Sequence, residues 1–188
     1  MTTTRSEHPP MVPSDEAKGK ELAMARRQGE AFSEALNHMV GEVADDGQEM
    51  HAGPYLVGYA VERPEGMYML DENGELFWHE PQDENVHLEI SVRDAADGRF
   101  IPSLIIHARL VDSQGNDVGV HEQPFIWHPW LYHYGRNWRV PADGDYRLEV
   151  DIKAPTFPRH DKDNGRRYER DVLAEFPVVK IQTQAAEG

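Results

Sequence analysis

The sequence contains no cysteine in its 188 residues. Disulfides, zinc–thiolate sites, iron–sulfur clusters and cysteine nucleophiles are therefore excluded. No run approaches the roughly 20 consecutive apolar residues of a membrane-spanning helix, so we expect no direct membrane insertion. The first residues, MTTTRSEHPPMVP, lack the apolar segment of a secretory signal peptide. A Gly-rich phosphate loop, a G-x-S-x-G elbow and a His-Glu-x-x-His helix are also missing.

Basic residues are scarce as well. Nineteen lysines and arginines, of which only five are lysines, stand against 34 aspartates and glutamates, which gives a net charge of −15. Such a surface repels phosphate backbones and anionic lipid, so we expect no nucleic-acid partner. The same charge attracts cations, metal ions among them. Apolar residues make up 39% of the chain, enough for one core, which excludes a wholly disordered protein.

The hydrophobic pattern divides the chain into two parts. From Asp15 to Ala44, apolar side chains recur at steps of three and four residues, which predicts a helix. Beyond Gly53, alternating and β-rich runs are separated by turn sequences, and no later segment keeps a helical period. The predicted organisation is a disordered leader at 1–13, a helical extension at 14–52, a β-domain at 53–183 and a tail at 184–188.

Short strands at this spacing predict an antiparallel sandwich or barrel. The segment before Tyr146 favours the sandwich, because a Tyr opening a strand just after Ala142-Asp-Gly144 resembles the tyrosine corner of immunoglobulin-like folds. We therefore predict an all-β fold, an immunoglobulin-like antiparallel β-sandwich, with the N-terminal helical extension packed against it or across a dimer. The predicted strands are Tyr55–Glu62, Glu75–His79, Asn85–Arg93, Phe100–Val111, Phe125–Trp130, Asn137–Val140, Tyr146–Ile152 and Val172–Thr183.

Histidine carries the clearest functional pattern, since six of the ten lie between His87 and His160. In Val86–Val92 the apolar residues alternate and are expected to face the core, because the side chains of a strand repeat with period two. His87 and Glu89 then share the opposite face, about 7 Å apart at Cα. An imidazole and a carboxylate held there can reach one cation. The alternative is an ordinary polar pair that faces solvent.

Later histidines lie in turns that a sandwich can bring together. His128 and His133 stand among Pro, Trp and Tyr residues ahead of Gly135, which permits a tight turn, and aromatic neighbours of this kind limit solvent access to a site. His160 follows Phe157-Pro-Arg, just beyond the strand that Tyr146 opens. Because the turns at one end of a sandwich converge, histidines far apart in the sequence can meet there.

Four motifs in this order resemble the periplasmic ferrous-iron transport protein family. They are Val86-His-Leu-Glu-Ile90, His133-Tyr-Gly135, the turn Pro141-Ala-Asp-Gly-Asp-Tyr146, and Arg159-His160 followed by an Asp/Asn/Gly loop. The similarity runs from about Tyr55 to Ile181. It implies an immunoglobulin-like sandwich and a metal site rather than a covalent mechanism.

The resemblance also implies a function and partners. The metal would be iron(II) or copper, bound to support iron uptake, and the ligands here would be His87, Glu89, His133 and His160. A homodimer, a membrane iron permease as partner and an extracytoplasmic location in the periplasm or cell envelope are implied as well. The lack of a visible signal peptide leaves a cytoplasmic location open.

One position departs from the family pattern. Family members usually carry a Met ligand about seven residues before the histidine of the His-Tyr-Gly motif, where this chain has Phe125 or Ile126. The loss of a soft sulfur weakens a preference for Cu(I) and leaves a harder set suited to Fe(II), Cu(II), Zn(II) or Mn(II). Met67, Met69 and His128 are the candidates to replace the missing ligand.

Two other functions stay open. His87, Glu89 and one later histidine match the two-His-one-carboxylate set of non-haem Fe(II) enzymes, which keep open positions for oxygen and substrate. A third histidine ligand leaves less room for a substrate, so we expect a metal-binding transport protein without enzymatic activity. The other alternative is a plain β-sandwich module for protein contacts, whose histidines are incidental.

Overall fold

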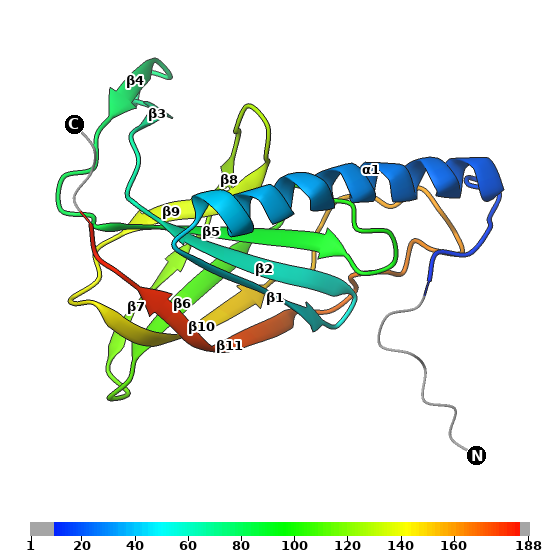
Figure 1. The fold of residues 1–188 in the computed structure, drawn as a ribbon. Helices are drawn as coiled ribbons and strands as arrows, with labels where there is room; N and C mark the ends of the chain where they lie inside the picture. The colour runs from blue at the N-terminus through cyan, green and yellow to red at the C-terminus, as the bar shows by residue number, and fades with distance from the viewer. Residues whose placement is uncertain (1–9, 185–188) are drawn as a thin grey trace.

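The computed structural model describes residues 10–184, and its elements are shown in Figure 1. The chain begins with helix α1 (Gly19–His38), which continues as a short π-helix, η1 (Met39–Val43). The strands are β1 (Asp46–Ala52), β2 (Tyr55–Glu62), β3 (Met67–Leu70), β4 (Leu76–His79), β5 (Val86–Asp94), β6 (Ile106–Asp112), β7 (Asp117–Glu122), β8 (Phe125–Ile126), β9 (His133–Trp138), β10 (Gly144–Ile152) and β11 (Val172–Ile181). In the described part of the chain, no helix is long and apolar enough to cross a membrane.

Two antiparallel sheets form the body of the molecule. One has the order β1-β2-β5-β9-β8 and the other β11-β10-β6-β7, while β3 and β4 form a separate hairpin that projects from the sandwich (Figure 1). The core between the sheets consists of alternate apolar residues such as Val57, Leu88, Ile90, Leu148 and Val150, which are almost completely buried. The predicted antiparallel β-sandwich with an N-terminal helix is therefore confirmed.

The start of β10 shows how local sequence fixes the sandwich. The hydroxyl of Tyr146 donates a hydrogen bond of 2.6 Å to the backbone carbonyl of Ala142, four residues earlier. This is the bond expected of a tyrosine corner, and it pins the turn before β10 to the strand. Tyr146 is thus structural, as the sequence indicates.

Helix α1 lies across the outer face of the β1-β2-β5-β9-β8 sheet (Figure 1). A glycine is required where the helix passes over the turn after β5, because a Cβ on Gly29 would lie 1.8 Å from the carbonyl oxygen of Asp97. The side chain of Arg93 on β5 binds Ser33 of the helix and Glu49 of β1. These contacts turn an outer sheet face, which would otherwise meet solvent, into a buried layer.

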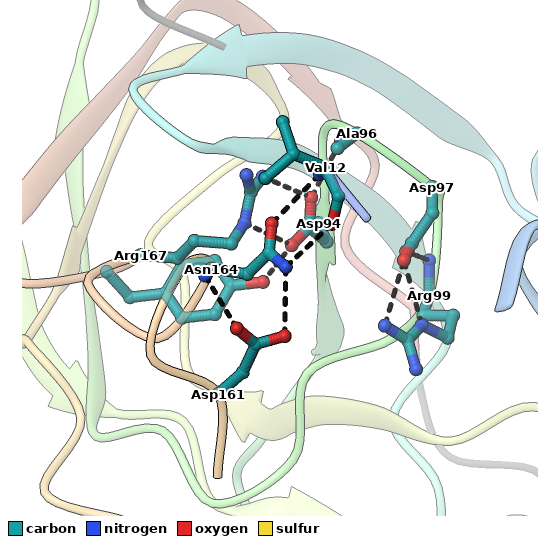
Figure 2. A network of polar contacts seen from close by, with 9 residues as sticks. Val12, Asp94, Ala96, Asp97, Arg99, Asp161, Asn164 and Arg167 are labelled. Carbon is teal, nitrogen blue, oxygen red and sulfur yellow. Dashed lines mark hydrogen bonds and ion pairs between the residues drawn. The ribbon is translucent and has the colours of Figure 1, made fainter. Parts of the chain in front are cut away.

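A polar network holds the end of the sandwich at which β5 finishes (Figure 2). Arg167 binds the carboxylate of Asp94 through two hydrogen bonds of 2.9 and 2.6 Å, and the hydroxyl of Tyr168 donates to the same carboxylate. Asn164 pairs with the backbone of Val12 through two bonds of 3.0 Å. The network joins the loop before β11 to the residues that precede the helix.

This network changes part of the predicted domain organisation. Val12 belongs to the predicted disordered leader, yet Asn164 fixes its backbone. Positions 1–9 of that leader and 185–188 of the predicted tail lie outside the described residues. The sequence did not show this because the Asn164 partner is 152 residues away.

The predicted helical extension also ends earlier than residue 52. Ala44 has an extended backbone, with φ −72° and ψ 148°, and the chain then forms β1 along β2. β1 lies at a sheet edge with mixed burial, so its sequence DGQEMHA shows no alternation of apolar residues.

Strand boundaries differ most where proline or a positive φ interrupts a β-rich run. The strand expected from Phe100 begins at Ile106, because Pro102 and Ser103, with φ 64°, bend the chain before it. The run expected over Phe125–Trp130 keeps only β8, and β9 begins at His133 rather than at residue 137. The end of β9 therefore lies within a predicted strand, whereas its first residues were not predicted to form a strand.

Candidate metal centre

Three polar side chains meet on the outer face of β5 and β9. His87 and Glu89 are alternate residues of β5, so both point away from the core, as the period of the strand predicts. β9 runs antiparallel to β5 with Glu89 opposite Gly135 and His87 opposite Asn137, which makes His133 a diagonal neighbour of Glu89. One ligand atom from each of the three side chains lies within 4.8 Å of the others.

The cluster is buried, although its sheet face points away from the core. His87 is 1% exposed, His133 3% and Glu89 5%. Leu131, just before β9, packs with Ala60 of β2 and Met39 of the π-helix to form a small apolar cluster on the same side of the sheet. The end of the N-terminal helix and the segment before β9 therefore cover the side chains that the sequence alone would leave facing solvent.

The backbone fixes the tautomer of His133. Its Nδ1 lies 3.0 Å from the carbonyl oxygen of Leu131, and since a carbonyl cannot donate, Nδ1 carries the hydrogen. The lone pair of the neutral ring is then on Nε2, which is buried and faces Oε1 of Glu89. Burial lowers the pKa of His133 to about 4, so the ring is neutral at neutral pH.

Asn137 fixes the tautomer of His87. The Asn137 amide donates to the carbonyl oxygen of Glu65 at 2.7 Å, and its Oδ1 accepts from the backbone N–H of Glu65 at 3.2 Å. This orientation makes Oδ1 an acceptor for Nδ1–H of His87, at 2.7 Å. Burial lowers the pKa of His87 as well, so its Nε2 also presents a lone pair.

Glu89 faces both free imidazole nitrogens. Its Oε1 lies 3.1 Å from Nε2 of His133 and 4.0 Å from Nε2 of His87. Burial, with repulsion from Glu62 and Glu65, raises the pKa of Glu89 to about 9. Two lone-pair atoms 3.1 Å apart repel each other unless a proton or a cation lies between them. Without an ion, Glu89 is therefore protonated at neutral pH and its proton lies towards His133.

Gly135 provides the space between these ligands. A Cβ at this position would lie 3.1 Å from Nε2 of His87, 3.1 Å from Cδ1 of Ile126 and 3.2 Å from Cδ2 of His133. The glycine thus leaves empty the point at which both imidazoles converge, and it lies within β9 rather than in the tight turn that the sequence suggests. Ile126, one of the two residues that stand where the resemblance implies a Met ligand, reaches the same point.

The structure does not bring His160, the fourth predicted ligand, to this cluster. Its side chain is 92% exposed and its Nδ1 lies 3.2 Å from the carboxylate of Glu16. His160 adjoins the Asp161–Asn164 turn, at the end of the sandwich where Asp94 closes β5 (Figure 2). Glu89 and Asp94 are five positions apart along β5, a distance of about 16 Å. Within one chain, three of the four predicted ligands lie together and His160 lies apart from them.

The candidates for the missing ligand fall in two places. Met67 and Met69 lie on the projecting β3–β4 hairpin, and Met69 is exposed. The ring of His128 is closer, with its centroid 5.9 Å from that of His133. Sequence reasoning missed Asn137 and Leu131, which orient the two histidines, because neither a hydrogen bond between strands nor one to a nearby backbone carbonyl leaves a periodic signal.

The fold and the cluster define a β-sandwich protein with a buried candidate metal centre of two histidines and one glutamate. A family model described as Fe2+ transport protein matches residues 67–178, more than half of the chain. The chain therefore belongs to the Fe2+ transport protein family, as its motifs predict. No protein with curated annotation matches the chain.

Solved structures agree on the fold. FetP of uropathogenic Escherichia coli is 23% identical with a TM-score of 0.56, over 72% of this chain and 95% of FetP. Copper-reconstituted P19 of Campylobacter jejuni is 16% identical with a TM-score of 0.60, over 73% of this chain and 94% of P19. A copper-bound methionine-to-isoleucine variant of P19 is 18% identical with a TM-score of 0.58, over 75% of this chain and 97% of that protein.

Proposed function

We propose that the protein carries Fe(II) as cargo, bound by Nε2 of His87, Nε2 of His133 and the carboxylate of Glu89. The observation that carries this proposal is the buried pair of lone-pair atoms, Nε2 of His133 and Oε1 of Glu89, 3.1 Å apart. A divalent ion placed between the three ligands replaces the proton there. Neighbouring groups already hold both imidazoles in the tautomer that a metal requires, which is the usual arrangement around a protein metal site.

The donor set favours a borderline or hard divalent ion. Two imidazoles and a carboxylate suit Fe(II), Mn(II), Zn(II) or Cu(II), whereas Ile126 offers no sulfur for Cu(I). Copper-bound forms of FetP and P19, including the methionine-to-isoleucine variant of P19, support copper as a second ion that this site accepts.

Anaerobic titration of tag-free protein tests the cargo. We expect one tightly bound Fe(II) per chain, and Ile126→Met should raise the affinity for Cu(I) at least tenfold, because a thioether is added at the point where the imidazoles converge. Its affinity for Fe(II) should change far less. Ile126→Leu, which adds no sulfur, is the control. A protein that binds no Fe(II) would contradict the proposal.

We favour cargo binding over oxygenase chemistry, although two histidines and a glutamate are also the ligand set of non-haem Fe(II) enzymes. The family supports this, since it is a family of transport proteins. So does the site itself, because a centre whose ligands are at most 5% exposed leaves little room for an organic substrate beside the ion. Oxygen consumption by the Fe(II)-loaded protein in the presence of 2-oxo acids would overturn this choice.

We also propose an extracytoplasmic location and a homodimer that delivers iron to a membrane permease. FetP was produced recombinantly in the periplasm of Escherichia coli, which supports the location. The projecting β3–β4 hairpin exposes Tyr68, Leu70, Leu76 and Trp78, an apolar surface suited to contact with a second copy. Sedimentation equilibrium should therefore give twice the chain mass, and a monomer at micromolar concentration would contradict the dimer.

A further inference from the structure

A second group of carboxylates lies beside the metal centre. A pocket of about 550 Å³ is present where β2 ends, and the acidic side chains of Asp45, Glu62 and Glu65 line it together with one basic residue, Arg63. Two segments contribute to it, because the backbone N–H of Asp45 donates to the carbonyl oxygen of Val61 at 2.9 Å. Three like charges in one small pocket repel each other, and a bound cation relieves that repulsion.

Glu62 distinguishes this pocket from an ordinary acidic surface. Its side chain is only 9% exposed, and its Oε1 is buried with no hydrogen-bond partner in the part of the chain that the structure describes. Leaving a carboxylate oxygen buried without a donor is costly, and buried charges in proteins are normally paired or bound to a metal ion. The Gln184 amide donates to Asp45 at 2.5 Å, which leaves further lone pairs on that carboxylate.

The pocket borders the buried centre directly. Glu62 is the residue of β2 that stands opposite His87 of β5 in the antiparallel register. Glu65 is bonded through its backbone to Asn137, the same amide that accepts the hydrogen bond from Nδ1 of His87. An ion bound by Glu62 and Glu65 would therefore lie next to His87, a predicted ligand of the centre.

We propose that Glu62, Glu65 and Asp45 form a second, outer site for a hard divalent cation such as Mn(II) or Fe(II). A set made only of carboxylate oxygens selects hard ions and disfavours Cu(I). The three acids exceed the single guanidinium of Arg63 in charge, so the pocket attracts cations. The existence of the site is independent of the proposed function. Its role as the position that cargo occupies before it reaches His87 rests on that function.

Manganese binding, followed by the loss of the EPR signal of the free ion, tests the site. Wild-type protein should bind two Mn(II) ions, one in each site. His133→Ala disables the buried centre and should retain one ion, whereas Glu62→Gln should lose the outer ion or bind it at least tenfold more weakly. Glu65→Gln should weaken the same ion, and since Glu65 is exposed, this variant tests the site without disturbing packing.

The control is Glu175→Gln, an exposed glutamate of β11 on the other sheet, which should leave both ions in place. One ion in wild type and none in His133→Ala would overturn the outer site and leave the proposed function intact. One ion that survives His133→Ala but is lost in Glu62→Gln would support the outer site alone, and the Fe(II) titration would then decide the proposed function separately. Equal weakening by Glu62→Gln and Glu175→Gln would mean binding to the acidic surface in general and would overturn the proposal.

Discussion

Replacing His133 by alanine is expected to abolish most of the stabilisation that metal gives the folded protein. A ligand that binds only the folded state adds RT ln(1 + [L]/Kd), about 2.7 kcal/mol at a hundredfold excess over Kd. For a domain of this size, that corresponds to a rise in melting temperature of roughly 5–11 °C. Alanine removes one of three ligands, and with it the Nε2 that stands 3.1 Å from Glu89. The measurement is the difference between the melting temperatures of each variant with and without metal at pH 7.5.

His160→Ala is the matched control, because it removes an exposed imidazole far from the centre. This variant should keep the full metal-induced rise in melting temperature. If His133→Ala also kept it, the ion would be bound elsewhere, most simply by the acidic surface. If His160→Ala lost it, the three-ligand description would be incomplete.

Glu89→Gln is expected to make the metal-free protein more resistant to unfolding at alkaline pH while removing metal binding. Burial raises the pKa of Glu89 from 4.5 to about 9. A raised pKa contributes stability that is fully present below the unfolded value, and this stability is lost as the pH rises towards 9, because the folded state must then hold a buried, unpaired carboxylate. Glutamine cannot ionise, so the variant escapes this loss.

The titration of His133 does not overlap the pH range in which the ionisation of Glu89 lowers stability. The pKa of His133 is lowered to about 4, so its contribution rises with pH and is complete above the unfolded value of 6.5. Glu62, whose pKa burial raises to about 7, titrates in both proteins. Between pH 6.5 and 8.5, urea unfolding in the presence of a chelator should therefore show wild type losing about 2–3 kcal/mol relative to Glu89→Gln. If the free energy of unfolding changed with pH in the same way in wild type and in Glu89→Gln, the conclusion that Glu89 is protonated would be wrong.

The same carboxyl sets the pH dependence of metal binding. An ion that takes the place of the Glu89 proton releases about one proton at pH 7.5, and its affinity should rise about tenfold per pH unit below the pKa of that group. A weakly buffered titration with a pH indicator measures this release. Protons compete for the imidazole of His133 only near pH 4, and burial lowers the pKa of His87 as well.

Strand period predicted two of the three clustered residues from sequence alone. The alternation of Val86, Leu88 and Ile90 places His87 and Glu89 together on the other face, and the structure confirms it. His133 could be assigned only through the resemblance, because its position depends on which strand pairs with β5. His160 could not be placed, since the end of the sandwich at which a turn lies depends on the order of all the strands before it.

The strands that the sequence did not predict are those that carry few core residues. β1, β3 and β7 lie at sheet edges or in the isolated hairpin, where few side chains enter the core. Burial of the candidate metal centre was also not predictable from β5 and β9. It depends on Met39 and Leu131, which belong to other segments and meet above the sheet only after the N-terminal helix has packed.

The two histidines of the candidate centre differ in how readily sequence variation can change their basicity. A side-chain amide, Asn137, orients His87, and a single nucleotide change can convert an asparagine into an aspartate that makes the imidazole a stronger base. A main-chain carbonyl orients His133, and it persists whatever side chain residue 131 carries. Natural variation can therefore adjust the strength of one imidazole while the other stays constant, so affinity for the ion can drift without loss of the geometry that defines the site.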